Sequence, residues 1–129
     1  GGTIALSAHG PAHYMEATEA VVKSMNMRYF FGHRIEFWPR DEKEIKTFFI
    51  TAGLDNIQTE RLTWIEEFEN GGEVFDYFAS TSGLWWHHRL PPEIRNKETE
   101  KTRTYFQHKN ITKITCDVVF AFGSKNRFT

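Results

Sequence analysis

Ten residues near the C-terminus, Lys113-Ile-Thr-Cys-Asp-Val-Val-Phe-Ala-Phe122, decide the fold expected for this chain. Apolar side chains recur along them at period two, which is typical of a β-strand. From Val118 onward the opposite face, formed by Val119 and Ala121, is apolar as well. A strand that is apolar on both faces is normally covered on both faces, as in the middle of an α/β sheet. The sequence therefore predicts that this last strand is central and has a neighbour on each side.

Two earlier stretches are the candidate neighbours. In Thr3–Ala8, Ile4 and Leu6 alternate with small residues, which predicts a closely packed first strand. Without a neighbour, this strand would be an apolar sheet edge that is prone to association with other chains. Asn56–Trp64 mixes apolar residues with charges, and charged side chains fit the outer edge of a sheet. If the C-terminal strand lies between these two, we expect it to run antiparallel to both.

Helices are predicted between and after these strands. The clearest one begins at Asp41, whose spacing from Glu44 is a variant of the capping box. One face of this helix is predicted to be buried, and Gly53 is expected at its C-terminal end. That face consists of Ile45, Phe48, Phe49 and Ala52. Three further helices are predicted at roughly 14–26, 73–79 and 93–107.

Composition excludes several classes of protein. The chain has 129 residues, of which 40% are hydrophobic and 26% charged, as in one ordinary globular domain. The net charge of −1 gives no electrostatic reason to expect nucleic acid or a membrane as a partner. The single cysteine, Cys116, excludes a disulfide framework and favours a cytoplasmic location. Aromatic residues make up 16% of the chain, which indicates a generous core or, less often, an apolar ligand cavity.

Three segments occur in an informative order: Gly1-Gly-Thr-Ile-Ala-Leu6, then Ile45 through Ala52-Gly53-Leu54, then Val118-Val-Phe-Ala-Phe-Gly-Ser-Lys125. Together they resemble class I S-adenosylmethionine-dependent methyltransferases, and in particular the small-molecule enzymes related to ubiquinone and menaquinone biosynthesis. The first segment resembles the Gly-Gly turn and fifth strand of that family. The second is similar to the helix and Ala-Gly-Leu sequence before strand six. The third resembles the seventh strand with its terminal Gly-x-Lys.

The resemblance covers nearly the whole chain but only the C-terminal half of that fold. It implies an α/β fold in which residues 1–129 form a single partial domain of a Rossmann-like methyltransferase, with strands five to seven and a central, antiparallel last strand. Residues 66–111 would be a helical insertion between the last two strands. The implied function is the acceptor-binding half of a methyltransferase that acts on a small molecule.

The cofactor implied by the resemblance is S-adenosylmethionine, which the family binds mainly through its N-terminal half. This sequence contains no G-x-G-x-x-G loop, so no donor-binding residue is assigned. We therefore expect the chain alone to be inactive. The expected partners are the small-molecule acceptor and, beside the first strand, either the missing N-terminal half or a partner chain.

Candidate acceptor-binding residues follow the first strand, because ligands of doubly wound sheets lie beyond the carboxyl ends of the strands. His9 comes directly after that strand, and His13 and Tyr14 follow within five residues. They are candidates because methyl transfer needs an oriented nucleophile on the acceptor and sometimes a general base. The alternative is that His9 and His13 are exposed loop residues without a role.

A second group of candidates lies in the insertion, where this family often builds a lid over the acceptor. It consists of Trp85, Trp86, His87 and His88. The alternative interpretation of this cluster is a hydrophobic plug against the sheet. A metal site is not predicted, because Gly10-Pro11 interrupts the spacing of His9 and His13 and the chain has neither a second cysteine nor an H-E-x-x-H motif.

Two other functions fit the same residues. One is a self-contained small-ligand-binding α+β domain with an aromatic cavity. The other is an interaction module in which the exposed first strand recruits a partner by strand addition.

Overall fold

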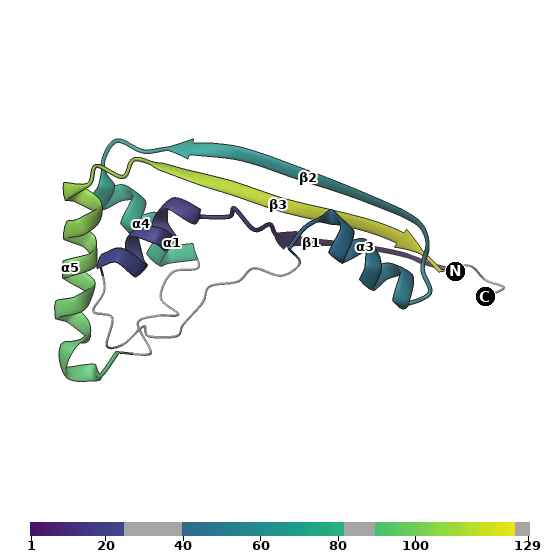
Figure 1. Ribbon diagram of the computed structural model, residues 1–129, viewed down its shortest axis with the longest axis horizontal. Helices are drawn as coiled ribbons and strands as arrows, with labels where there is room; N and C mark the ends of the chain where they lie inside the picture. The colour runs from purple at the N-terminus through teal and green to yellow at the C-terminus, as the bar shows by residue number, and fades with distance from the viewer. Residues whose placement is uncertain (25–39, 82–89, 126–129) are drawn as a thin grey trace. The chain divides into compact units, whose positions relative to one another are not determined.

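The computed structural model describes residues 1–24, 40–81 and 90–125 (Figure 1). Every predicted strand and helix corresponds to one of the elements observed in these residues. In chain order they are β1 (Thr3–His9), α1 (Met15–Ser24), α3 (Glu42–Thr51), β2 (Asp55–Glu67), α4 (Gly71–Thr81), the 3₁₀ helix η2 (Pro92–Ile94), α5 (Arg95–His108) and β3 (Lys113–Ser124).

The strands form a sheet in the order β1-β3-β2, so the last strand of the chain is central, as predicted. β1 and β3 are antiparallel, with a register that runs from Thr3 opposite Ser124 to His9 opposite Val118. β2 also runs against β3 (Figure 1). The sequence pattern therefore identified both the α/β class and the position of the central strand.

The described residues group into two compact units. The sheet unit comprises the described parts of 1–13, 36–64 and 116–129. The helical unit comprises those of 14–35 and 65–115. The strands β2 and β3 each have residues in both units.

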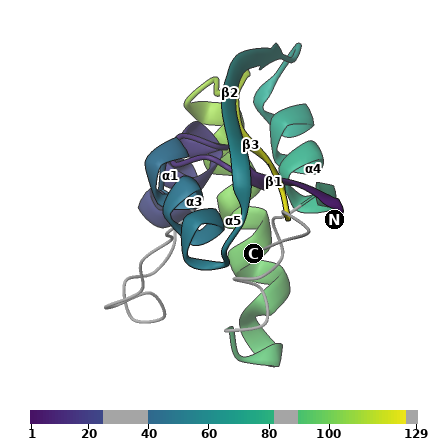
Figure 2. The ribbon, with the colours of Figure 1, turned by 90° about the vertical axis from the view of Figure 1, so that its right-hand side faces the viewer.

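The core of the sheet unit lies between α3 and one face of the sheet (Figure 2). Ile45 and Phe49 of α3 pack with Leu54 against Val119 and Ala121 of β3. Alternation along β3 places residues 117, 119, 121 and 123 on this covered face. Gly123 allows α3 to approach closely, because a Cβ atom there would lie 2.8 Å from Cδ2 of Phe49.

Both ends of α3 have the predicted chemistry. The Asp41 carboxylate accepts a hydrogen bond from the Glu44 amide at 2.8 Å and caps the first turn. At the other end Gly53 adopts a positive φ of 76°, and the Leu54 amide donates to the Phe49 carbonyl at 3.0 Å. This is the Schellman arrangement that glycine favours, and it turns the chain directly into β2.

Three predictions about burial are wrong. The first strand was predicted to be closely packed, but Ile4 and Leu6 of β1 are 49% and 40% exposed. Helical spacing predicts Phe48 and Ala52 in the buried face of α3, but Phe48 is 42% exposed and Ala52 is exposed as well, because the helix contacts the sheet through Ile45 and Phe49. The apolar pattern of the last strand predicts cover on both faces, yet Phe122 is 39% exposed. Within the described part of the sheet unit, α3 is the only helix, and it covers a single face.

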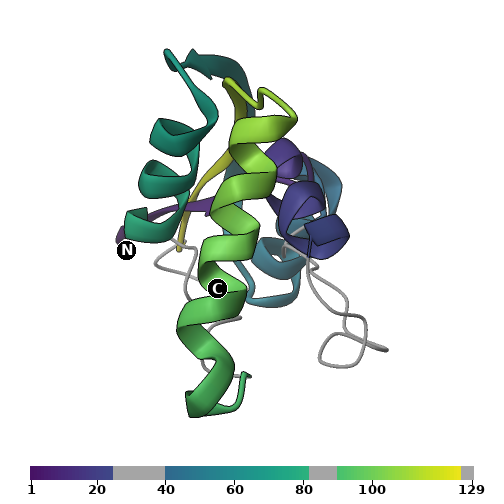
Figure 3. The same cartoon turned by 90° about the vertical axis from the view of Figure 1, so that its left-hand side faces the viewer.

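The helical unit packs α5 against α4 and α1 (Figure 3). The Phe75 and Phe106 rings meet edge to face, with centroids 5.5 Å apart. Ser24 donates to the hydroxyl of Thr102 at 3.2 Å, which satisfies two buried polar groups inside the α1–α5 contact. Lys97, Glu100 and Lys101 of α5 are exposed, as its sequence predicted, whereas Glu98 is buried.

Replacement of Gly123 by alanine tests the close contact between β3 and α3. Gly123→Ala should lower the free energy of unfolding by about 1–3 kcal/mol, because the new methyl group overlaps Phe49. Gly2→Ala is the matched control, since no atom lies within 4 Å of the Cβ position there. Urea unfolding of both variants is the measurement, and equal midpoints would contradict the packing described.

Candidate functional site

The candidate site lies at the turn that follows β1. The backbone continues the β1–β3 pairing beyond His9, since the Gly10 amide donates to the Asp117 carbonyl at 2.7 Å. Gly10 is required there, because a Cβ atom would lie 2.4 Å from Cγ of Asp117. This contact holds the turn against β3, at the carboxyl end of β1 where the sequence predicted the site.

The structure brings together the two histidines of this turn. The rings of His9 and His13 stack, with centroids 3.9 Å apart and planes inclined by 17°. His9 is exposed and His13 is buried. Beside His9 lies a pocket of about 390 Å³ that is also lined by Ser7, Ala8 and Val118. The pair therefore presents one imidazole to a pocket and supports it with another from behind.

The buried histidine has a defined protonation state. Its Nδ1 accepts a hydrogen bond from the Asp117 amide at 3.0 Å, so the neutral ring carries its hydrogen on Nε2. Burial, together with the neighbouring His9, lowers the pKa of His13 to about 4, although Asp117 acts in the opposite direction. At neutral pH His13 is thus an uncharged hydrogen-bond donor. A role for His13 as the general base is not supported, because the nitrogen that would accept a proton is already bonded.

Behind the histidines lies a buried carboxylate that sequence reasoning missed. Asp117 on β3 has 0% relative exposure. Its two oxygens face Arg61 of β2 in a bidentate pair, with Nε to Oδ1 at 2.8 Å and Nη2 to Oδ2 at 2.6 Å. The Ala12 amide donates to Oδ2 at 3.0 Å, and the Thr63 hydroxyl makes a longer bond of 3.4 Å to Oδ1.

These contacts determine the charge of Asp117. The hydrogen bond from Arg61 keeps the pKa of the carboxyl below its usual range, against the opposing effect of burial. The carboxylate is therefore ionised at neutral pH and committed to partners within the chain. Such a group orients its neighbours and does not act as a proton acceptor for a ligand.

Tyr14, the third candidate of the turn, belongs to the helical unit. Its hydroxyl lies 3.2 Å from that of Tyr77 on α4, and its ring meets Phe78 edge to face. Its backbone has a positive φ of 57°, an unusual conformation for a bulky residue, and its amide donates to the Thr115 carbonyl at 2.8 Å. Tyr14 is not among the residues that line the pocket beside His9.

The second predicted group, Trp85, Trp86, His87 and His88, lies outside the described residues. Its assignment to the acceptor site stays a prediction.

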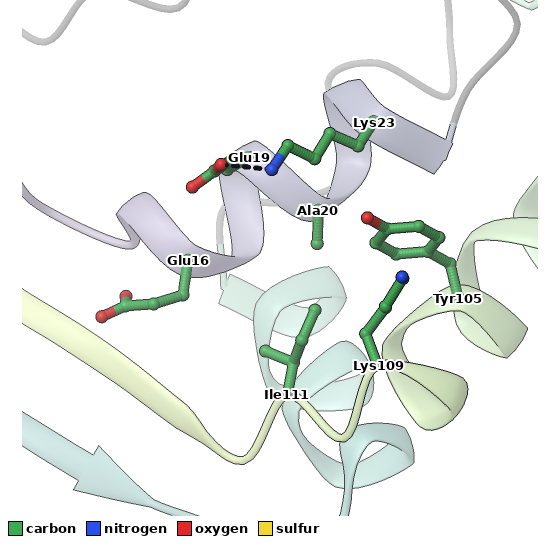
Figure 4. Close-up of a pocket in the computed structure, with 7 residues that line it drawn as sticks. All are labelled: Glu16, Glu19, Ala20, Lys23, Tyr105, Lys109 and Ile111. Carbon is green, nitrogen blue, oxygen red and sulfur yellow. Dashed lines mark ion pairs between the residues drawn. The ribbon is translucent and has the colours of Figure 1, made fainter.

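A second pocket, of about 310 Å³, lies in the helical unit between α1 and the end of α5 (Figure 4). Its charged groups are engaged by neighbours in the chain. Lys23 pairs with Glu19 at 2.6 Å, Glu16 accepts the Thr115 amide at 2.8 Å, and the Lys109 ammonium lies 5.9 Å from the centre of the Tyr105 ring. The lining therefore indicates no particular class of ligand.

The described residues contain no group of three or more His, Cys, Asp or Glu side chains arranged to hold a metal ion. None of the helices in the described ranges combines the length and apolar content that a membrane-spanning segment needs. In comparisons with known proteins, no protein-family model and no curated protein matches this chain.

The state of His13 predicts how stability depends on pH. Because its pKa is about 4 in the folded chain and ordinarily 6.5, the unfolded chain binds the proton more readily between these values. The His13 contribution is complete above pH 6.5 and is lost as the pH falls through 4, with a slope of up to ~1.4 kcal/mol per pH unit. Urea midpoints measured from about pH 7.5 down to about pH 4 give this slope.

His13→Gln should flatten that pH dependence, since glutamine does not titrate. His108→Gln at the exposed end of α5 is the control and should keep the slope of the natural sequence. A slope that survives in His13→Gln would show that another group is responsible.

Proposed function

We propose that this chain is the acceptor-binding half of an S-adenosylmethionine-dependent methyltransferase that acts on a small molecule. In this proposal a preceding segment or a partner chain holds the methyl donor, and the complete enzyme works in the cytoplasm. The chain itself provides strands five to seven of the fold, and the turn after β1 borders the acceptor.

The observation that carries the proposal is the position of the last strand. β3 enters the sheet between β1 and β2 and runs antiparallel to both, the arrangement that the resemblance implied for strand seven. The positions of two of the resembling segments also support the proposal. Ala52-Gly53-Leu54 forms the turn from α3 into β2, and Lys125 directly follows the end of β3.

The exposed imidazole of His9 has a chemical role that suits this function. His9 lines a pocket at the carboxyl end of β1, and in the doubly wound sheets to which this proposal assigns the chain, ligands bind beyond the carboxyl ends of the strands. A small acceptor in that pocket would lie beside an exposed imidazole, which can hydrogen-bond a hydroxyl or amine and orient it for attack. His13 would fix the plane of that imidazole by stacking.

The size of the natural protein and its binding of the donor test the proposal. The protein isolated from its source cells should have roughly twice the mass of this chain, as a complete doubly wound domain requires. It should bind S-adenosylmethionine in a calorimetric titration, whereas the 129-residue chain alone should not. A natural species of 15.2 kDa that binds no donor, alone or with a partner, would refute the proposal.

A role of β1 as a docking edge is the second candidate, and it is favoured by a separate observation. Ile4 and Leu6 are 49% and 40% exposed, and β1 is at the edge of the described sheet. The register directs the amides of residues 4, 6 and 8 toward β3, because Gly10 and Lys125 bond across the same ladder. The amide of Ala5 therefore points away from β3, toward the free edge.

Proline substitutions on β1 test whether a further strand pairs with it. In the 129-residue chain Ala5→Pro should change stability little, because the lost amide makes no bond to β3. In the natural protein or complex it should cost about 1–3 kcal/mol if a strand lies beside β1, since a partner carbonyl is then left unsatisfied.

Leu6→Pro is the positive control, because it removes an amide that faces β3 and should destabilise the chain in both settings. Thermal unfolding of the three forms in each setting is the measurement. An equal effect of Ala5→Pro in the chain alone and in the natural protein would exclude a neighbouring strand.

A further inference from the structure

Asp117 contacts three separate points of the turn between β1 and α1. Its carbonyl accepts the Gly10 amide at 2.7 Å, its carboxylate accepts the Ala12 amide at 3.0 Å, and its amide donates to His13 Nδ1 at 3.0 Å. One residue of β3 thus sets the backbone path of the turn and the orientation of the buried imidazole.

A buried carboxylate needs a compensating charge, and Arg61 supplies it. The pair is bidentate and charge-assisted, so it fixes the rotation of the carboxylate as well as its position. Glu42 of α3 lies 3.9 Å from Arg61 Nε and extends the network to the helix. Since Oδ2 accepts both Arg61 and Ala12, a displaced guanidinium would also disturb the turn.

We propose that Arg61 and Asp117 are positioning residues for the histidine site: the pair holds the turn from Gly10 to His13 so that His13 stays stacked behind His9 at the pocket. This inference rests on the proposed function only in assigning the site to the binding of an acceptor. The pair acts from outside the pocket, whose lining consists of Ser7, Ala8, His9 and Val118.

The competing role is purely structural, a clamp that joins β2 to β3. A clamp would affect stability and leave the histidines unchanged in the folded chain. A positioning pair would affect the histidines even where the chain remains folded. The two roles are therefore separated by measurements on the imidazoles and not by stability.

The experiment uses nuclear magnetic resonance of the 129-residue chain, with ¹⁵N chemical shifts to report the tautomer of each histidine. In the natural sequence His13 should be a single tautomer with hydrogen on Nε2, and an Overhauser effect should connect the His9 and His13 rings. In Arg61→Lys, which keeps the charge but loses the bidentate geometry, we expect the ring–ring effect to be lost. The His13 pKa should rise from about 4 toward 6.5 as the ring becomes solvated.

Asp117→Asn is the second variant and removes the charge while retaining an acceptor for Ala12. It should also lose the ring–ring effect and the single tautomer. The matched control is Arg103→Lys, because Arg103 forms a second bidentate pair with Asp76, at 2.5 and 3.1 Å, in the helical unit. This control should leave both histidines as they are in the natural sequence.

Unchanged stacking, tautomer and titration in folded Arg61→Lys and Asp117→Asn would overturn the inference and leave only the clamp. Failure of both variants to fold would overturn it too, because the pair would then be required by the whole unit. None of these measurements uses a methyl donor. If the histidines move as expected but the natural protein binds no S-adenosylmethionine, only the proposed function fails.

Discussion

A single buried charge organises the sheet unit. Asp117 has no exposed surface, yet it carries a carboxylate on the central strand of the sheet. An ionised group in that position is tolerated only if its oxygens are paired. Arg61 and the Ala12 amide provide that pairing, and they come from the strand on one side and the turn on the other. The need to pair this carboxylate therefore fixes β2, β3 and the turn relative to one another.

The sheet of this unit is covered on one face and open on the other. The apolar residues of β3 pack against α3 on one side only, because α3 is the only helix in the described part of the sheet unit. The other side keeps Phe122 exposed, and the edge of β1 keeps Ile4 and Leu6 exposed. Apolar surface of this kind at a sheet edge favours contact with further protein. Both functions that we propose place a further strand at that edge.

Local signals were readable from the sequence and distant ones were not. The cap at Asp41, the glycine stop at Gly53 and the period of β3 depend on residues close in the chain, and each was predicted correctly. The sequence placed His9 and His13 close together in the chain, but it did not predict that their rings stack. Asp117 was not identified, because an aspartate within an apolar strand resembles a polar interruption and its partner Arg61 is 56 positions away. Phe48 was misassigned because helical periodicity defines a stripe but not how much of it the sheet contacts.

The chemistry of the site constrains the proposed function more than the fold does. Related folds support many reactions, so the strand order alone identifies no chemistry. The site removes two candidates for a proton acceptor: Asp117 is ionised but committed to Arg61, and His13 has its Nδ1 bonded to the Asp117 amide. His9 is the remaining candidate of this turn that also lines the pocket. Among the described residues of this site, His9 is therefore the candidate for a base from the chain, if transfer requires one. A nucleophile that needs no base would use the same imidazole only for orientation.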